Sequence, residues 1–372
     1  MLGVLEVAGR GSGFLRRREA SYLPSQGDVH VGERLIRQYG LRTGDEIAGS
    51  VRGPAKGKSA SLETITSVLG KSPDVLRQRP EFGRLGAVHP NEQLRLESTG
   101  TPGPADYTNR VIDLLCPLGK GQRALIVAPA KAGKTMVLQS IAQGVSANYP
   151  GADLFILLVD ERPEEVFEME AAGVGEVIAS SFDNPAQQHV AVAELTLERA
   201  RRRVEMGDDV VLIVDSLTRL ARAYNTVEKG TGRTLSGGLD AQSLEKPKRF
   251  LGSARRIDPS QSEGSLTIIA TALVDTGSKM DQVIFEEFKG TGNSEMVLSR
   301  ELAERRIFPA IDLVASATRR EELLLSEEPL AAARVLRQRI AGMTPINAMN
   351  DLLVDLKRYP TNEALIRALN QT

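Results

Sequence analysis

A short apolar segment, a loop of small residues and an amphipathic segment follow one another in the first half of this chain and constrain its fold most. Residues 124–127 have the length and side-chain branching of a buried strand. The loop after them ends in Gly133, Lys134 and Thr135, and apolar side chains then recur at helical spacing over 136–142. A strand, a loop and a helix in this order are typical of a phosphate-binding loop, so we expect a nucleotide to bind here.

The expected loop also predicts which groups hold the nucleotide. Its backbone N–H groups and the start of the following helix favour an anion at one point. Lys134 would reach the β- and γ-phosphates of ATP, and the Thr135 hydroxyl would hold Mg²⁺. The generic motif has glycine where Ala128 stands, so this loop must bend without it. The residues that we expect around the nucleotide are Pro129, Lys131, Ala132, Gly133, Lys134, Thr135 and Met136.

The composition excludes several classes of protein. With 47 Lys and Arg against 48 Asp and Glu, the bulk charge does not indicate a nucleic-acid partner, which would need a local basic stripe. The single cysteine, Cys116, excludes a disulfide framework and a cysteine-rich zinc site. No stretch is long and uncharged enough to span a bilayer, and the first residues do not resemble a signal peptide. We therefore expect a cytoplasmic protein of two or three domains with no membrane partner.

The amino-terminal part differs from the rest. Residues 1–69 contain short apolar segments separated by turns, which predict a small barrel or sandwich. Phe14 beside Arg16 gives a basic strand end with one aromatic ring, and this suits single-stranded nucleic acid on an OB-type barrel. A solvated turn next to a buried Phe explains the same residues equally well. Residues 70–112 are rich in Pro, Gly, Arg and Glu, and we interpret them as a connector.

Further apolar segments in residues 113–372 predict a parallel sheet covered by helices on both faces. They lie at 154–159, 210–214 and 266–271, and a helical carboxyl-terminal part follows over 330–369. Glu161 follows the first segment and could polarise a water for attack on the γ-phosphate, or simply favour the start of the next helix. Asp215 ends the second segment, as a Walker B acid that holds Mg²⁺ does.

Two loops and a group of arginines complete the candidate sites. The loops at 229–240 and 275–280 combine small residues with single positive charges, which suits contact with nucleic-acid phosphates, although mobile surface loops are commoner. Arg319 lies near another strand end, where a free Arg can complete the phosphoryl-transfer site of a neighbouring subunit. The alternative explanation is surface solvation or pairing with Glu321 and Glu322.

Several longer segments together resemble the Rho family of bacterial transcription termination factors. The matching segments are 126–129, 131–135, 159–166, 215–216, 218–225, 237–238, 275–281 and 286–293, which run through most of the chain. The family also has Ala at the position of Ala128, so the departure from the generic motif supports the resemblance. Ala130 replaces a Pro that the family usually has.

The resemblance implies an α/β fold, with a RecA-like P-loop ATPase core preceded by a small all-β OB-fold domain of the cold-shock type. It also implies a homohexameric ring that hydrolyses ATP to move along single-stranded RNA, with RNA polymerase as a further partner. Lys134, Thr135 and Asp215 would bind Mg²⁺ and ATP, and Glu161 would activate the water.

The resemblance assigns roles to further residues. Arg162 would couple subunits, Arg319 would act as an arginine finger in the neighbouring site, and Phe308 would pack on the adenine. The residues that would contact RNA are Phe14, Arg16, Arg233, Thr234, Gly237, Gly277, Ser278 and Lys279.

The first domain matches the family less closely. Ser12, His30 and Ser59 stand where the primary RNA site of the family usually has aromatic side chains. Stacking contributes roughly 1–3 kcal/mol per base, so their loss could weaken this site and its preference for pyrimidines.

Two other functions fit part of the pattern. A rotary-ATPase subunit shares the core and an amino-terminal β domain, but would not need the loops that carry Arg233 and Lys279. A non-catalytic RNA-binding ring would use nucleotide only to assemble, and Glu161 argues against it.

Overall fold

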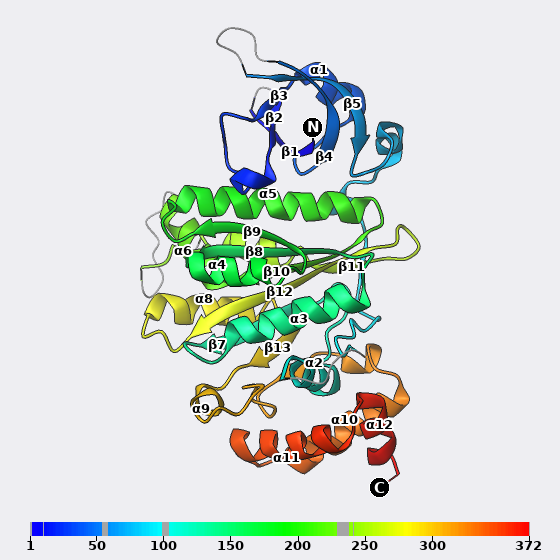
Figure 1. The fold of residues 1–372 in the computed structure, drawn as a ribbon, viewed down its shortest axis with the longest axis vertical. Coiled ribbons are helices and arrows are strands. Elements are labelled where there is room, and N and C mark those ends of the chain that lie inside the picture. The colour runs from blue at the N-terminus through cyan, green and yellow to red at the C-terminus, as the bar shows by residue number, and fades with distance from the viewer. Residues whose placement is uncertain are drawn as a thin grey trace.

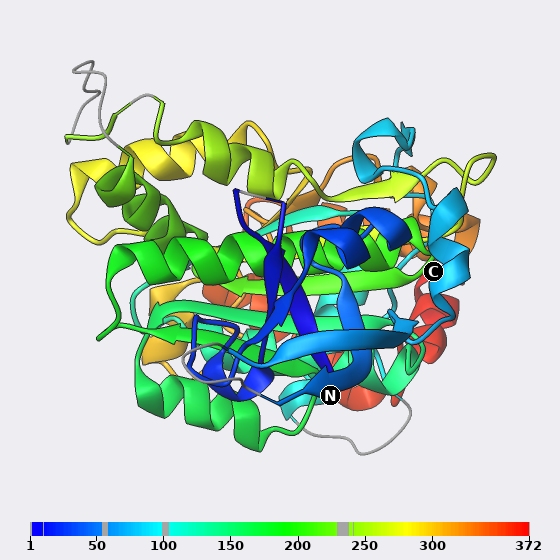
Figure 2. The same cartoon turned by 90° about the horizontal axis from the view of Figure 1, so that it is seen from above.

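The computed structural model describes residues 2–9, 11–53, 59–98, 104–228, 238–240 and 242–371. A barrel, a helix-covered sheet and a group of carboxyl-terminal helices follow one another along the long axis (Figure 1). In the view from above, the barrel lies over the sheet layer (Figure 2). Among the described residues, no helix combines the length and the apolar character needed to cross a bilayer.

Five strands close the barrel in the order β1-β2-β3-β5-β4. They are β1 (Leu2–Val7), β2 (Gly13–Arg16), β3 (Val29–Val31), β4 (Glu46–Arg52) and β5 (Ser61–Val68). Leu5, Leu15 and Ile47 fill the interior. The short helix α1 (Glu33–Tyr39) lies between β3 and β4 and was not predicted, but its Leu35 and Ile36 pack against the same interior.

The large sheet has nine strands, and its main path runs β14-β13-β7-β12-β10-β8-β9. The strands are β6 (Ala87–Val88), β7 (Arg123–Pro129), β8 (Asp153–Glu161), β9 (Glu176–Ser181), β10 (Asp209–Asp215), β11 (Arg255–Ile257), β12 (Ser265–Val274), β13 (Ser294–Val297) and β14 (Ala317–Thr318). Those from β13 to β9 on this path pair in parallel, as predicted. Strand β9 was missed because few of its residues are large and apolar.

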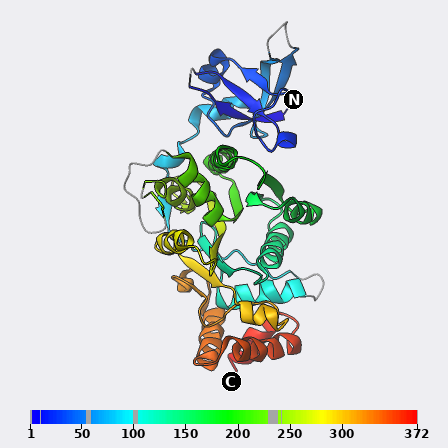
Figure 3. The same cartoon turned by 90° about the vertical axis from the view of Figure 1, so that its left-hand side faces the viewer.

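Helices cover both faces of the sheet (Figure 3). They are α2 (Pro104–Leu115), α3 (Lys134–Asn148), α4 (Pro163–Ala171), α5 (Ala186–Glu205), α6 (Leu217–Val227), α7 (Glu245–Leu251), α8 (Lys279–Lys289) and α9 (Arg300–Glu304). Successive strand residues alternate between two cores: Ile156 packs on the side of α2 and α3, and Leu157 on the side of α5 to α8. Burial on both faces explains the near-continuous apolar strands.

The connector is tied to its surroundings. It contains the 3₁₀ helices η2 (Pro73–Gln78) and η3 (Phe82–Arg84) and the strand β6, which pairs with β11 and so joins the sheet. Helix α2 begins within the predicted connector and packs against α3. The predicted helical carboxyl terminus consists of α10 (Glu327–Ile340), α11 (Pro345–Arg358) and α12 (Asn362–Leu369). Buried Arg110 of α2 fixes these helices by donating to the carbonyls of Leu356 and Tyr359 at 2.9 and 2.8 Å.

Helix α5 separates the barrel from the sheet (Figure 1). Its apolar face packs on β8 and β10, while its other face meets the barrel. Buried Arg199 of α5 donates to Glu46 of β4 at 2.7 Å, to Glu176 of β9 at 2.7 Å and to the Tyr22 hydroxyl at 2.9 Å. One side chain therefore joins the barrel, α5 and the sheet.

Candidate active site

The predicted phosphate-binding loop joins the end of β7 to the start of α3. Strand β7 ends at Pro129, and Lys134 is the first residue of α3. Gly133 precedes the helix with φ of +84°, and Lys131 also has a positive φ, +63°. Glycine adopts this left-handed region without steric cost, so Gly133 suits the turn into α3. The predicted order of strand, loop and helix is confirmed.

Three predicted residues meet beside this loop. The Lys134 Nζ donates to Asp215 Oδ1 at 2.7 Å and to Glu161 Oε1 at 3.0 Å. Both carboxylates are buried, at the carboxyl ends of β10 and β8. Thr271 of β12 donates to Asp215 Oδ1 at 2.6 Å and fixes that carboxylate. Residues distant in sequence therefore form one charged cluster at the strand ends, where ligands bind in such sheets.

A bulge at Asp160 sets the orientation of Glu161. The pairing of β8 with β9 shifts register between Val159 and Glu161, and Asp160 has φ of +57°. Glu161 therefore turns into the protein while Asp160 stays half-buried. Arg219 of α6 contacts both, with its Nη1 3.0 Å from Asp160 Oδ2 and its Nε 3.3 Å from Glu161 Oε1. Arg219 lies within one of the segments that resemble the Rho family, but no role was predicted for it.

The charges of this cluster shift the proton affinities of its members. Burial and the nearby Asp215 raise the pKa of Glu161 to about 7, while Lys134 and Arg219 oppose this rise. Burial alone would lower the pKa of Lys134. The negative charges of Asp215 and Glu161 outweigh this effect, so the Lys134 pKa is raised. A carboxylate that titrates near neutral pH can take up a proton at the working pH of an enzyme, so Glu161 suits a general base.

The acidic groups also fit a divalent cation. Carboxylate oxygens of Glu161, Glu165 and Asp215 lie within 4.8 Å of one another. Oxygen donors of this kind are what Mg²⁺ prefers. Glu165 was not predicted, although its place in the first turn of α4 could have suggested it. Thr135, the predicted metal ligand, follows Lys134 in the first turn of α3 and is partly exposed.

A cavity of about 270 Å³ opens next to the phosphate loop. Its lining includes Gly133, Met136, Gln139 and Phe308. The Phe308 ring lies close to Gly133, since a Cβ added to that glycine would be 3.6 Å from the ring. The structure therefore brings the predicted adenine-packing residue to the phosphate loop, and an aromatic face next to it suits a nucleobase.

The two predicted arginines lie at opposite ends of the parallel strands. Arg162 is at the carboxyl ends, and Arg319 is near the amino-terminal end of β7. Arg162 directly follows Glu161 and is exposed, in a cavity with Asp160, Phe182 and Arg219. Arg319 is also exposed, and its backbone N–H donates to Asn293 next to the start of β7. Strand β7 separates that position from the phosphate loop by about 20 Å at about 3.3 Å per residue. Within one chain, Arg319 therefore does not meet Lys134.

The second predicted RNA loop is built on α8. Gly277 has φ of +77°, and the Ser278 hydroxyl caps α8 by accepting from the Asp281 N–H at 3.4 Å. Lys279 is exposed and is the first residue of the helix, so it does not belong to a loop as predicted. Buried Asp281 is held by Arg222 of α6, whose Nε donates to it at 2.7 Å. The other predicted RNA residues, Arg233, Thr234 and Gly237, lie outside the described residues.

On the barrel, Phe14 and His30 face each other across β2 and β3. Their rings meet edge to face, with centroids 5.6 Å apart. The Arg16 guanidinium lies 5.4 Å from the Phe14 centroid and forms ion pairs with Glu6 and Asp28. His30 therefore contributes a ring to this surface, while Arg16 shares its charge with two acids.

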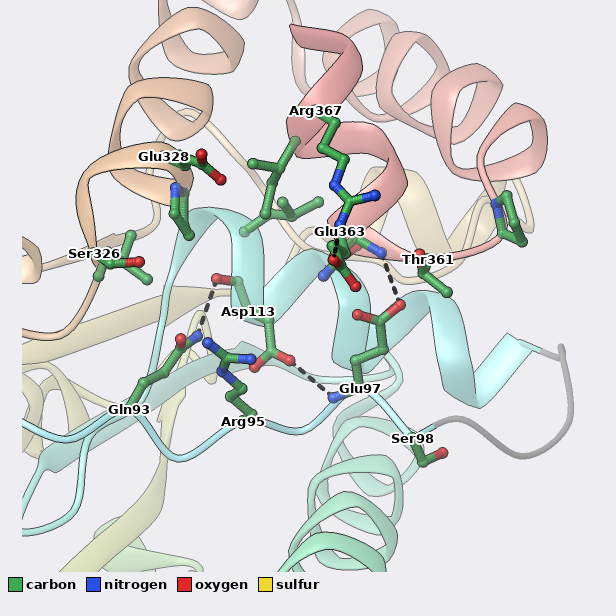
Figure 4. Close-up of a pocket in the computed structure, with 16 residues that line it drawn as sticks. Gln93, Arg95, Glu97, Ser98, Asp113, Ser326, Glu328, Thr361, Glu363 and Arg367 are labelled. Carbon is green, nitrogen blue, oxygen red and sulfur yellow. Dashed lines mark hydrogen bonds and ion pairs between the residues drawn. The ribbon is translucent and has the colours of Figure 1, made fainter. Parts of the chain in front are cut away.

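A larger cavity, of about 620 Å³, lies between the connector, α2 and the carboxyl-terminal helices (Figure 4). None of the predicted site residues lines it. Asp113 accepts from the backbone N–H groups of Leu96 and Glu97 at 3.0 and 2.8 Å, and burial raises its pKa to about 7. The Glu97 carboxylate accepts from the N–H of Asn362 at 2.9 Å. These bonds fasten the connector to α2 and α12, which is a structural role.

Two family models match the chain. The Rho termination factor, RNA-binding domain, matches residues 1–74, and the ATP synthase alpha/beta family, nucleotide-binding domain, matches residues 108–318. The first range covers the barrel and the second covers the sheet from β7 to β14. The matches confirm the predicted fold class, an all-β barrel of OB type before a P-loop ATPase core.

Two curated relatives match all or nearly all of the chain, and a solved structure matches part of it. A transcription termination factor Rho from Haemophilus influenzae is 51% identical over 371 residues, 100% of this chain and 87% of that protein. One from Gemmatimonas aurantiaca is 54% identical over 363 residues, 97% of this chain and 49% of that protein. A solved ATPase from the type III secretion system of pathogenic bacteria is 26% identical, with a TM-score of 0.57 over 70% of this chain and 82% of that chain.

Proposed function

This chain belongs to the family of transcription termination factor Rho, and from that premise we propose that it ends transcription as an ATP-driven motor on nascent single-stranded RNA. The ATPase-family match supports an enzyme that hydrolyses ATP, and the barrel match supports RNA as its partner. The observation that carries the proposal is the cluster of Lys134, Glu161 and Asp215 beside the phosphate loop. It combines a phosphate ligand, a base and a metal-binding acid.

In this proposal the nucleotide lies across the loop from Pro129 to Met136. Lys134 and the backbone N–H groups at the start of α3 bind the phosphates, and the adenine packs on Phe308. Glu161 takes the proton of the attacking water, and Arg219 keeps its carboxylate in place. Thr135 and Asp215 would hold Mg²⁺, which supplies positive charge against the phosphate oxygens when bound.

The assembly is a further part of the proposal. We divide the chain into an RNA-binding domain over 1–69, a connector over 70–112 and an ATPase domain over 113–372. The exposed Arg319 lies at the sheet edge opposite the phosphate loop, so a head-to-tail neighbour is needed to bring the two together. A closed homohexamer meets this need, with Arg162 coupling adjacent sites.

RNA is the substrate along which the ring moves. Phe14 and Arg16 on the barrel make the first contact, and Gly277, Ser278 and Lys279 contact phosphates nearer the ATPase sites. We assign the same contact to Arg233, Thr234 and Gly237. A motor of this kind works where transcripts are made, so we place it in the cytoplasm with RNA polymerase as a partner.

The rotary-ATPase subunit is less well supported. The type III secretion ATPase has a related core, but the match over 1–74 is to an RNA-binding domain. The non-catalytic ring is opposed by Glu161, whose position and raised pKa suit a base.

ATP hydrolysis with and without single-stranded RNA tests the proposal, using cytidine-rich and adenosine-rich strands in parallel. Strong stimulation by RNA is expected. A preference for cytidine would mean that the barrel selects pyrimidines although Ser12, His30 and Ser59 replace aromatic residues. A rate of ATP hydrolysis that neither RNA strand increases would contradict the motor.

The Glu161→Gln variant tests the base. It should bind ATP like the wild type and lose hydrolysis by about a thousandfold or more, because amides do not accept the proton. Exposed Glu164, three residues further along the chain, gives the matched control Glu164→Gln, which should retain activity.

A further inference from the structure

A second cavity, of about 360 Å³, lies where the barrel, the connector and the sheet meet. Arg42 comes from the turn before β4 and Phe82 from η3, and Arg255 begins β11. Arg201, Arg202 and Glu205 come from the end of α5. These six residues line the cavity together with Glu81 and Gly83, and we call it the arginine cavity. β11 pairs with the start of β12, whereas the phosphate loop follows the end of the parallel strand β7, so the cavity is at the opposite strand ends from that loop.

The acids of this region do not neutralise its arginines. Glu205 is fully buried, and it already lies 3.0 Å from Arg42, 3.1 Å from Arg202 and 3.4 Å from Arg79. Glu198 serves both Arg201, at 2.6 Å, and Arg202, at 3.2 Å. A third acid, exposed Glu81, also lines the cavity and pairs with Arg84 at 3.0 Å, so none of these three acids forms an ion pair with Arg255.

Arg255 is the cation that these acids leave without a partner. Within the described part of the chain it forms no ion pair, and it donates only to the Ser253 carbonyl at 3.3 Å. Its guanidinium lies 4.6 Å from the centroid of the Phe82 ring, and that of Arg201 lies 5.5 Å from the same centroid. Arg201 already pairs with Glu198, so the charge at this ring that lacks an anion is that of Arg255.

The surroundings increase this positive charge. Arg123 at the start of β7 donates to the carbonyls of Thr291 and Ala254 at 2.9 and 3.3 Å, and no described carboxylate pairs with it. Burial, together with Arg201 and Arg123, lowers the pKa of Arg255. Arg202 is nine-tenths buried, and its Nε has no hydrogen-bond acceptor among the described residues.

We propose that the arginine cavity binds a phosphate group, with Arg255 as its principal ligand and Arg201 and Arg42 beside it. Guanidinium groups bind phosphate oxygens through paired N–H donors, which the fixed fork of Arg provides. The volume falls in the range of small-ligand sites and admits a diphosphate or a phosphodiester. Because the ligands come from the barrel and the sheet, a bound phosphate would hold these two parts together.

Inorganic pyrophosphate tests this site by isothermal titration calorimetry on the full chain. Magnesium and a non-hydrolysable ATP analogue first saturate the phosphate loop. Arg255→Gln should weaken pyrophosphate binding by about tenfold, since a charge-assisted contact is lost. The matched control is Arg256→Gln in the same strand. Arg256 already lies 3.4 Å from Asp209 and 3.6 Å from Glu92, so this variant should bind like the wild type.

The salt dependence of RNA binding identifies the source of the phosphate. Fluorescence anisotropy of a labelled cytidine strand gives the slope of log affinity against log salt. If the cavity takes an RNA phosphodiester, Arg255→Gln reduces this slope by roughly 0.7, the value for one contact on a single strand. An unchanged slope with weakened pyrophosphate binding identifies a free phosphate or diphosphate.

Identical behaviour of Arg255→Gln and Arg256→Gln in both measurements would overturn the proposal. Thermal melting of Arg255→Gln serves as the folding control. Because the variant removes one of several like charges, we expect its melting temperature to be no lower than that of the wild type. Arg255→Lys is the second variant: it keeps the charge but loses the fork, and we expect intermediate affinity. Loss of RNA-stimulated hydrolysis with intact pyrophosphate binding would count against the proposed motor and leave this site standing.

Discussion

Glu161 shows how much chemistry depends on a single residue's neighbours. Its carboxylate is buried next to Asp215, and both effects raise its pKa, while Lys134 and Arg219 limit the rise. A general base must be ionised to act, so activity should rise with pH through this pKa. We expect kcat/KM for ATP in the wild type to have an acid limb with its midpoint near pH 7, the value to which the Glu161 pKa is raised.

Replacing Arg219 by Gln should move this limb to higher pH. The variant removes a cation 3.3 Å from Glu161, so the ionised form of Glu161 is less stabilised and its pKa rises further. We expect kcat/KM at pH 7 to fall roughly threefold or more and to recover partly at pH 8.5. Arg34→Gln, an exposed change on α1, should leave the profile unchanged. A limb at the same pH in both variants would refute the role of Arg219.

Phe308→Ala tests the adenine contact. Loss of a stacking partner costs about 1–3 kcal/mol, so KM for ATP should rise about tenfold while kcat changes little. Inhibition by tripolyphosphate should be unaffected, because that ligand has phosphates but no base. If both ligands weaken equally, Phe308 supports the loop rather than the nucleobase.

The sequence predicted the residues that chemistry requires but not those that orient them. Lys134, Glu161 and Asp215 each follow a recognisable strand or loop pattern, and they meet as expected. Arg219 was missed because its role depends on the bulge at Asp160. A single left-handed residue within an apolar strand leaves no periodicity for the sequence to reveal.

At the scale of elements, the turn before β4 is fitted closely to α5. Gly44 has φ of +94°, and a Cβ there would lie 2.4 Å from the backbone carbon of Glu198. No side chain can occupy that space, so the barrel approaches α5 as closely as backbone allows.

Gly44→Ala should therefore lower the free energy of unfolding by roughly 2 kcal/mol or more, through both strain and displacement of the barrel. Urea denaturation measures this change. Gly40→Ala is the matched control: Gly40 also has a positive φ, +61°, but nothing lies within 4 Å of its added Cβ. That variant should lose only about 1 kcal/mol from backbone strain. Equal losses in the two variants would show that the contact with α5 does not matter.

The sequence predicted the helices and strands that have a clear apolar pattern, but not the short strands that lack one. Strands β7, β8, β10 and β12 are buried on both faces, so their sequences are almost continuously apolar. The short strands β6 and β11 depend on pairing with each other, which only the folded chain brings about. Helix α8 includes Lys279 because Ser278 caps it, a local signal that the glycine before it obscured.

At the scale of the whole molecule, Arg199 fastens the barrel to the ATPase core. Arg199→Leu would leave Glu46 and Glu176 in a partly buried site without their shared cation. Removing one partner of a buried ion pair costs about 3–5 kcal/mol, and because Glu46 keeps its ion pair with Arg203 at 2.8 Å, we expect a loss of stability of about 3 kcal/mol and faster trypsin cleavage in the connector. Arg37→Leu, which breaks an exposed pair on α1, should cost no more than about 0.5 kcal/mol. Similar losses in both would mean that Arg199 does not join the two parts.

The sequence predicted the order of the parts but not their contacts. A barrel, a connector and a nucleotide-binding sheet follow from local patterns. The position of α5 between barrel and sheet follows from contacts such as Arg199 with Glu46, which are 153 residues apart. Pairings over such distances have no signature in a single sequence.

Helix α5 is one uninterrupted span of 20 residues, which corresponds to about 30 Å. Near its first turn, His189 is 2.7 Å from the Ser180 hydroxyl and 4.0 Å from Asp160, which lies at the bulge of β8. Its last turns form the arginine cavity, and the barrel sits on the residues before them. An uninterrupted α-helix of this length bends little, so its two ends move together. The same helix therefore contacts the barrel near its end and Asp160 near its start, so a displacement of the barrel along the helix axis would reach the residue next to Glu161 directly.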